Sequence, residues 1–185
     1  ADPLFTLSYT GVNGGLVICV ADDPGMHSSQ NEQDSRHYAI ASKVPMLEPA
    51  DSSESYNFAK KAFELSEKFD TPVIIRMCTR IAHSQSIVDT SERKEAERIE
   101  YKKNPAKYIM MPGNAKKRHP IVEERTKALA AFAENCDFNR EEMGGTELGI
   151  ITSGTCYQYV KEVFGDSVSI YKIGLINPMP TDALK

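Results

Sequence analysis

Short apolar runs alternate along this chain with longer amphipathic segments. Residues 16–20 form an unbroken apolar run, and residues 73–77 form a second apolar run. Runs of this length are typical of strands that are buried on both faces of a parallel sheet. Between them the sequence predicts helices over 30–42 and 51–69 and a short strand over 44–48. Strands that alternate with helices in this way predict a parallel sheet with right-handed crossovers, so the fold class is α/β.

Both of these helices begin at a capping box, in which a side-chain oxygen accepts from the backbone three residues on while Glu reaches back. The two boxes are Ser29-x-x-Glu32 and Asp51-x-x-Glu54. In the longer helix, residues at helical spacing form an expected core face, namely Phe58, Ala59, Ala62, Phe63, Ser66 and Phe69.

The α/β pattern stops after residue 80 and resumes near residue 148. Residues 83–119 are a charged, Pro-containing linker, followed by a predicted helix over 121–134 with Pro120 at its start and a loop over 137–146. A second unit follows, with predicted strands over 148–152 and 168–173 and a helix over 157–164. Residues 4–13 are expected to form a helical turn or loop. Because the chain starts without Met and ends where Thr181 has the features of an N-cap for a new helix, we expect an internal fragment of a longer protein.

Composition excludes several functional classes. The chain has 185 residues, of which 41% are hydrophobic and 26% charged, the balance of a globular protein. A net charge of -4 argues against a general nucleic-acid binder. No apolar stretch is long enough to span a bilayer and no signal segment is evident, so we expect a cytoplasmic protein without membrane contact.

The cysteines and histidines predict no metal site. Four cysteines lie far apart without a C-x-x-C pair, so we expect buried free thiols. His37, His83 and His119 have no ligand-like spacing.

The loop after the first strand carries the densest polar chemistry. It begins with the turn Asp22-Asp23-Pro24-Gly25 and lies at the carboxyl end of a parallel strand, where open α/β sheets bind ligands. His27 could serve as a general acid or base, or as a donor to a substrate carboxylate that Arg36 also binds. The candidate site residues are His27, Ser28, Ser29, Asn31 and Arg36. A Ser-His-acid hydrolase is disfavoured because no G-x-S-x-G elbow surrounds these serines.

Two further polar clusters have open interpretations. Asp22 and Asp23 could bind Mg²⁺, although turn formation before Pro24 is the favoured explanation. The basic run at residues 116–119 is either a solvated linker that packs on a neighbouring domain or an anion site.

Several long segments resemble a known family. They are DPLFTLSYTGVNGGLVICVADDPGMHSSQNEQDSRHYAIASKVPMLEPADS, FAKKAFELSEKFDTPVIIRMCTRIAHS, NPAKYIMMPGNAKKRHPIVEER and LGIITSGTCYQYVKEV. They resemble the α subunits of indolepyruvate:ferredoxin oxidoreductases, which belong to the thiamine-diphosphate-dependent 2-oxoacid:ferredoxin oxidoreductases. The resemblance covers essentially the whole chain.

The resemblance implies three regions within the chain. Residues 1–85 would be the second half of a pyrimidine-binding domain, 86–145 a linker with one helix, and 146–185 the truncated start of a transketolase-C-terminal-like domain. It places the Glu that activates the pyrimidine upstream of Ala1, and the diphosphate motif and cluster-binding cysteines downstream of Lys185. By the resemblance, His27 and Asn31 contact substrate or intermediate, and Arg36 holds the loop or a carboxylate.

The resemblance also implies a reaction. The complete enzyme would decarboxylate indolepyruvate and other aryl pyruvates oxidatively to aryl-acetyl-CoA and pass electrons to ferredoxin. It would use thiamine diphosphate with Mg²⁺ and 4Fe-4S clusters, none bound by this fragment alone, and a smaller β subunit. Two alternatives stay open, namely the same chemistry on pyruvate or a branched-chain 2-oxo acid, and a non-catalytic α/β binding module.

Overall fold

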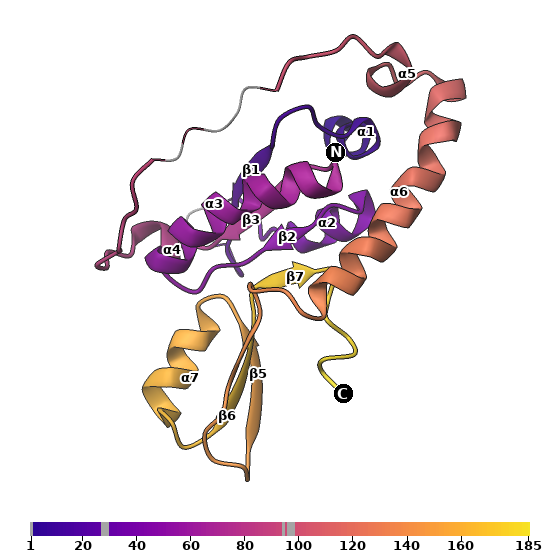
Figure 1. Ribbon diagram of the computed structural model, residues 1–185. Helices are drawn as coiled ribbons and strands as arrows, with labels where there is room; N and C mark the ends of the chain where they lie inside the picture. The colour runs from indigo at the N-terminus through magenta and orange to yellow at the C-terminus, as the bar shows by residue number, and fades with distance from the viewer. Residues whose placement is uncertain (1, 27–29, 94, 96–98) are drawn as a thin grey trace.

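Two small β-sheets with flanking helices form the core of the computed structural model, which describes residues 2–26, 30–93, 95 and 99–185 (Figure 1). The first sheet has the strand order β1-β3-β2-β7. Strands β1 (Val17–Ala21), β3 (Val73–Met77) and β2 (Met46–Leu47) are parallel. Strand β7 (Leu175–Asn177) pairs antiparallel with β2. The α/β class and the parallel order predicted over residues 16–77 are therefore confirmed.

Strand β3 is buried on both faces, as its apolar run predicts, whereas β1 lies at the edge of the sheet and leaves Cys19 and Ala21 exposed, so the same prediction for residues 16–20 is wrong. On one face Val73 and Ile75 pack against helix α3 (Ser52–Phe69). On the other face Ile74 packs with residues of helices α1 (Asp2–Thr10) and α2 (Arg36–Ser42). Successive side chains of a strand point to opposite faces, so β3 contributes to both cores.

The second sheet has the order β4-β6-β5 and belongs to the last third of the chain. Strands β5 (Gly149–Ser153) and β6 (Ser169–Ile173) are parallel and joined through helix α7 (Cys156–Phe164). Strand β4 (Arg140–Glu142) pairs antiparallel with β6 inside the segment expected to be a loop, so that expectation is wrong. Strand β4 consists of three consecutive charged residues, Arg-Glu-Glu, so its sequence carries no apolar pattern that would predict a strand.

The second unit contacts the first through a shared sheet and a buried ion pair, in addition to the covalent connection. Strand β7 follows β6 after one residue and extends the first sheet. Lys172 on β6 is completely buried, and its Nζ lies 2.5 Å from a carboxylate oxygen of Glu54 and 5.0 Å from the Phe58 ring centre. Burial lowers the pKa of Lys172. This ion pair therefore fixes the second sheet against α3.

One capping box forms and the other does not. Asp51 caps α3, because its carboxylate accepts from the Glu54 backbone N–H at 2.8 Å, and Glu54 reaches back to the Ala50 N–H at 2.7 Å. The helix expected from residue 30 instead begins at Arg36, since Glu32 accepts from the Gly25 N–H rather than capping a helix. Ser29 of that predicted box lies outside the described residues.

Helix α6 (Pro112–Ala133) starts earlier than the sequence predicts, and Pro120 lies inside it rather than at its start. Its first half includes Arg118, which donates to the Tyr9 carbonyl at 2.8 Å and to Asp70 at 3.1 Å. His119 Nδ1 lies 2.7 Å from the Tyr9 hydroxyl oxygen. Arg118 and His119 of the basic run therefore pack against α1, and Arg118 also contacts Asp70 at the end of α3.

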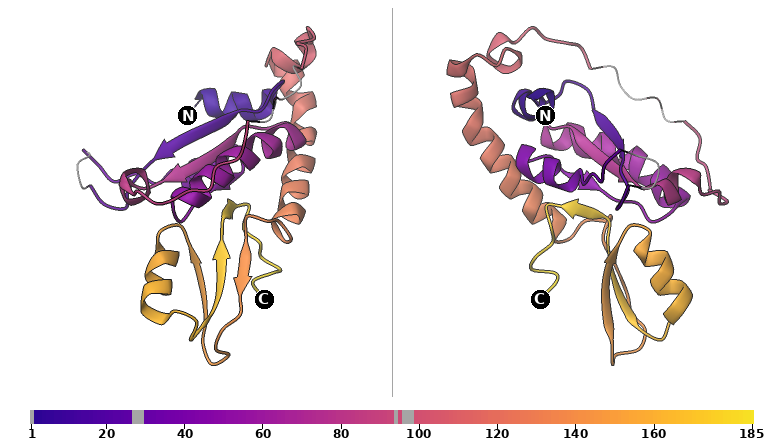
Figure 2. Two further views of the ribbon diagram at one scale, coloured as in Figure 1. Left: turned by 60° about the vertical axis from the view of Figure 1, so that its left-hand side comes forward. Right: turned by 180° about the vertical axis from the view of Figure 1, so that it is seen from behind.

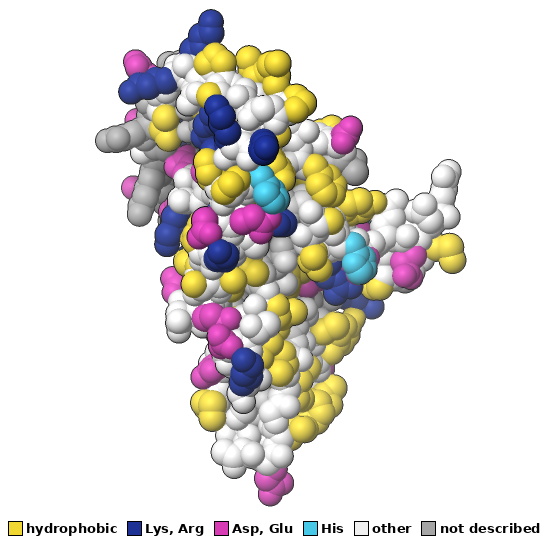
Figure 3. All heavy atoms as spheres, turned by 90° about the vertical axis from the view of Figure 1, so that its right-hand side faces the viewer, with side chains coloured by type: hydrophobic (Ala, Val, Ile, Leu, Met, Phe, Trp, Pro, Cys, Tyr) yellow, Lys and Arg dark blue, Asp and Glu magenta, His cyan; other side chains and the backbone are white. Residues whose placement is uncertain are grey.

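Helix α6 runs beside the first sheet from α1 to β7, and a short helix, α5 (Pro105–Tyr108), precedes it (Figure 2). Residues 2–10 form a complete helix rather than a turn or loop. Figure 3 shows charged side chains of both signs interspersed with apolar ones on the side that α6 occupies. Within the described ranges, no helix has the length and apolarity needed to cross a membrane.

Candidate active-site cavity

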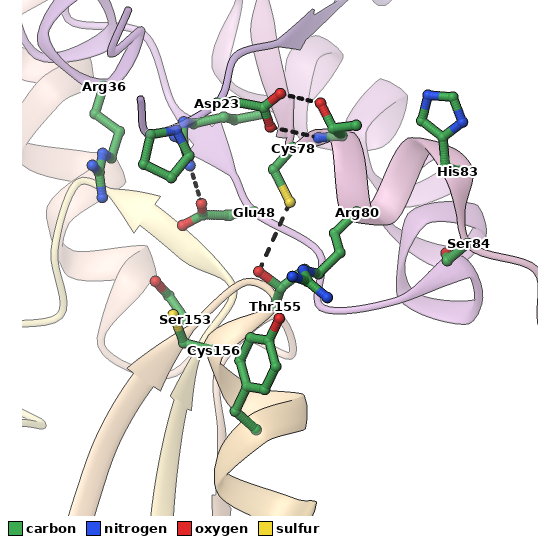
Figure 4. A pocket seen from close by; sticks show the side chains of 14 residues that line it. Asp23, Arg36, Glu48, Cys78, Arg80, His83, Ser84, Ser153, Thr155 and Cys156 are labelled. Atoms are coloured by element: carbon green, nitrogen blue, oxygen red, sulfur yellow. Dashed lines mark hydrogen bonds and ion pairs between the residues drawn. The ribbon is translucent and has the colours of Figure 1, made fainter. Parts of the chain in front are cut away.

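A cavity of about 860 Å³ lies where the carboxyl ends of β1 and β3 face the turn between β5 and α7 (Figure 4). The first sheet supplies one side of it, and helix α4 (Thr79–His83) and the start of α7 supply the other. Its position fits the rule that ligands bind at the carboxyl edge of parallel strands. The lining residues are Asp23, Pro24, Arg36, Glu48, Arg76, Cys78, Thr79, Arg80, His83, Ser84, Ser153, Thr155, Cys156 and Tyr159.

A buried ion cluster joins Asp22, Arg76 and Glu48, and its Arg76 and Glu48 side chains line the cavity. Arg76 at the end of β3 is 5% exposed, and its Nε lies 2.6 Å from Asp22 Oδ1 while Nη1 pairs with Glu48. Asp22 directly follows β1 and Glu48 directly follows β2, so one guanidinium ties together the ends of three neighbouring strands. Buried charges are tolerated when they are paired in this way.

The same cluster positions the loop that carries Arg36. Asp22 Oδ2 accepts from the Ser35 backbone N–H at 2.5 Å, at the residue just before α2. Asp23 accepts from the Thr79 backbone N–H at 2.6 Å and also bonds the Thr79 hydroxyl, which ties the loop to α4. The two aspartates thus hold the cavity walls, a role that neither simple turn formation nor Mg²⁺ binding describes. Gly25 has a positive φ of 87°, which is consistent with the turn predicted over residues 22–25.

Arg36 is the candidate residue from the sequence that lines the cavity. Its guanidinium is about half exposed and contacts Asp34 in a bidentate pair, with Nε–Oδ1 and Nη2–Oδ2 distances of 2.8 Å. Hydrogen bonds from Arg36 lower the pKa of Asp34 to about 2. The pair keeps the guanidinium charged and at the cavity rim, where an anionic ligand can reach it.

Asn31, the other candidate that the structure describes, does not line the cavity. Asn31 lies in an exposed loop, where its Oδ1 accepts from the Gln33 amide at 2.9 Å. His27, Ser28 and Ser29 lie outside the described residues.

The second unit supplies cavity residues that the sequence reasoning missed. Thr155, Cys156 and Tyr159 come from the turn after β5 and from α7, and Arg80 from α4 lies with its guanidinium 5.4 Å from the Tyr159 ring centre. The signal was present, because Ser153-Gly154-Thr155 is a second strand-to-helix junction. What the sequence could not show is that both junctions open into one cavity.

The cysteines differ from expectation. All four thiols are free, as expected, but Cys19 and Cys156 are exposed and Cys78 is half-buried. Cys19 lies on β1 at the edge of the first sheet, and Cys156 begins α7 beside the cavity. Cys136 is buried, and burial raises the pKa of its thiol.

The cavity does not fit a metal-bound diphosphate. In the part of the chain that the structure describes, no group of three or more His, Cys, Asp or Glu side chains could hold a metal ion. Glu48, which lines the cavity, already pairs with Arg76. The lining groups instead suit an organic anion with an apolar or aromatic part, because arginines, hydroxyls, thiols and an aromatic ring surround it.

Curated relatives match nearly the whole chain. An indolepyruvate oxidoreductase subunit IorA from Archaeoglobus fulgidus is 38% identical over 97% of this chain. The corresponding protein of Thermococcus kodakarensis is 40% identical over 97% of this chain, and that of Pyrococcus horikoshii is 40% identical over 100% of it. The chain spans 30% of the length of these relatives.

A solved structure shares the fold. The 2-oxoglutarate:ferredoxin oxidoreductase from Magnetococcus marinus, with 2-oxoglutarate, coenzyme A and succinyl-CoA bound, has a TM-score of 0.62 and 16% identity. The match covers 98% of this chain and 40% of that one. The profile of the family described as pyruvate flavodoxin/ferredoxin oxidoreductase, thiamine diphosphate-binding, matches residues 19–139. The chain therefore belongs to this thiamine-diphosphate-binding oxidoreductase family.

Proposed function

We propose that this chain is part of an enzyme that oxidises indolepyruvate and other aryl pyruvates. In the overall reaction the 2-oxo acid loses its carboxylate as carbon dioxide, and the remaining acyl group forms a thioester with coenzyme A. Two electrons pass to two ferredoxins and one proton is released. The observation that carries the proposal is 38–40% identity to indolepyruvate oxidoreductase subunits over 97–100% of the chain.

Within this enzyme, we assign Arg36 to the carboxylate of the 2-oxo acid. Its guanidinium is charged, lies on a cavity wall at the carboxyl edge of the sheet, and is held by Asp34 and by the Asp22–Ser35 bond. A planar guanidinium binds a carboxylate through two parallel hydrogen bonds. His27 and Asn31 stay proposals for contacts with the substrate or the intermediate.

The remaining components belong to the complete enzyme. Thiamine diphosphate, when bound, supplies the carbanion-stabilising chemistry. Mg²⁺, 4Fe-4S clusters, a smaller β subunit, ferredoxin as acceptor and a cytoplasmic location are parts of the same proposal. The boundaries at 85/86 and 145/146 also stay predictions, with 1–85 as half of a pyrimidine-binding domain.

A substrate panel on the complete two-subunit enzyme tests the proposal. Turnover of indolepyruvate, phenylpyruvate, pyruvate and 2-oxoisovalerate is measured with coenzyme A and ferredoxin, and each thioester product is identified by mass. We expect kcat/KM to be greatest for the aryl substrates. A preference for pyruvate or 2-oxoisovalerate would support the alternative substrate classes, and no turnover of any 2-oxo acid would support a non-catalytic binding module.

A further inference from the structure

Arg80 and Tyr159 contact each other inside the cavity, and the proposed function gives neither residue a role. The Arg80 guanidinium lies 5.4 Å from the Tyr159 ring centre, which is within the range of a cation–π contact. Arg80 comes from α4 beside the first sheet, and Tyr159 comes from α7 in the second unit. The contact exists only because the two units come together.

This pair differs from the other arginines of the cavity. Arg36 pairs with Asp34, and Arg76 pairs with Asp22 and Glu48. For Arg80, no carboxylate lies within ion-pair distance among the residues that the structure describes. The Tyr159 ring holds the guanidinium in the absence of such a partner, and Tyr159 is itself 48% exposed.

The pair lies across the cavity from Arg36, an arrangement that suits a substrate long enough to span the cavity. Figure 4 shows Arg36 on one side of the cavity and Arg80 on the other, with Thr155 and Cys156 between and below them. Arg80 and Tyr159 also line an adjoining cavity of about 540 Å³, so the space continues past them. A molecule with a carboxylate at Arg36 therefore extends its other end toward the Arg80–Tyr159 pair.

We propose that Arg80 and Tyr159 form the subsite for the aromatic ring of an aryl 2-oxo acid, and so determine specificity for aryl over aliphatic substrates. This inference rests on the proposed function. Aromatic rings pack favourably against guanidinium planes and against the faces or edges of other rings. An aliphatic side chain gains less from the same surface, because it has no π-face to place against the guanidinium.

Steady-state kinetics of the complete enzyme test the subsite. We expect Tyr159→Ala to lower kcat/KM for indolepyruvate and phenylpyruvate about 10-fold, mainly through KM, and to leave 4-methyl-2-oxopentanoate within about 2-fold. Tyr159→Phe keeps the ring and is expected to retain the wild-type preference. Arg80→Lys keeps the charge without the plane, and it should reduce the aryl preference in the same direction. If the aliphatic acid turns over too slowly, its inhibition constant against indolepyruvate replaces kcat/KM.

A matched control separates this role from general damage. Tyr101 is exposed in the linker and contacts the Tyr108 ring, so Tyr101→Ala removes a tyrosine away from the cavity and should leave the substrate preference unchanged. If Tyr159→Ala lowered kcat/KM equally for aryl and aliphatic acids, the subsite would be overturned. The same holds if that variant kept the wild-type preference for aryl over aliphatic acids. Failure of the proposed function is a different result, in which the wild-type enzyme turns over no aryl pyruvate.

Discussion

Replacing Arg76 by methionine should loosen the first sheet, because it leaves two buried carboxylates without their shared cation. Asp22 and Glu48 are both 8% exposed, and the Arg76 side chain contacts each of them. Methionine keeps an unbranched apolar stem of similar reach, so the packing of β3 is largely retained. The change therefore isolates the charge from the packing.

The expected magnitude follows from the burial of the cluster. Removing one partner of a buried ion pair typically costs about 3–5 kcal/mol, because the remaining charge stays desolvated. Surface ion pairs cost roughly 1 kcal/mol or less, and the 5% exposure of Arg76 places this cluster in the buried class. Since about 1.4 kcal/mol corresponds to a tenfold change, amide protection should fall by about 100- to 4,000-fold.

Hydrogen exchange of the complete subunit, followed by mass spectrometry, measures this directly. Peptides that cover β1 and β3 should lose protection in Arg76→Met, and the peptide over Ser35 should exchange faster because Asp22 no longer holds its N–H. The triple variant Asp22→Asn, Arg76→Met, Glu48→Gln should recover most of the protection, because no unpaired charge remains. Unchanged protection of β1 and β3 in Arg76→Met would refute the role assigned to the cluster.

Three other changes have expected outcomes. Asp51→Ala removes the cap of α3 and should destabilise the protein by about 1 kcal/mol in thermal unfolding, whereas Asp51→Asn should cost less. Gly154→Ala should destabilise by roughly 1–2 kcal/mol and lower turnover, because φ is +52° and a Cβ would lie 3.0 Å from the Glu48 Cδ. The pairing with Arg36 depresses the folded pKa of Asp34 to about 2, so it should stabilise the fold fully above the unfolded pKa near 3.9. This contribution to the free energy of unfolding should be lost as the pH falls through about 2. An NMR titration of the Asp34 carboxyl with a midpoint near 4 would contradict the pair.

The parallel core was predictable from sequence because its apolar runs have strand length and its helices have regular spacing. Residues 73–77 illustrate this, since Val73 and Ile75 face α3 while Ile74 faces the other side. Elements set by tertiary contacts were not predictable. Strand β4 has no apolar pattern, and the first half of α6 depends on the contacts of Arg118 with Tyr9 and Asp70.

The candidate site shows the same division. Arg36 was predictable because it follows an apolar parallel strand in the first strand-to-helix junction, and the structure places it on the cavity wall. Arg80 and Tyr159 were not, because they lie 79 residues apart in sequence and their contact depends on how the second unit sits against the first. No local sequence pattern predicts that two residues so far apart in sequence come into contact. Each of them alone is an ordinary exposed side chain on a helix.

The most direct test of the central claim is kcat/KM for indolepyruvate in the complete enzyme with Arg36→Gln, compared with wild type. Arg93→Gln is the matched control, because Arg93 is exposed in the linker and outside the cavity lining. We predict a fall of about 100-fold for Arg36→Gln, since a charge-assisted pair with the substrate carboxylate is lost, and no change for Arg93→Gln. Wild-type kcat/KM in Arg36→Gln would contradict the assignment of this cavity as the substrate site.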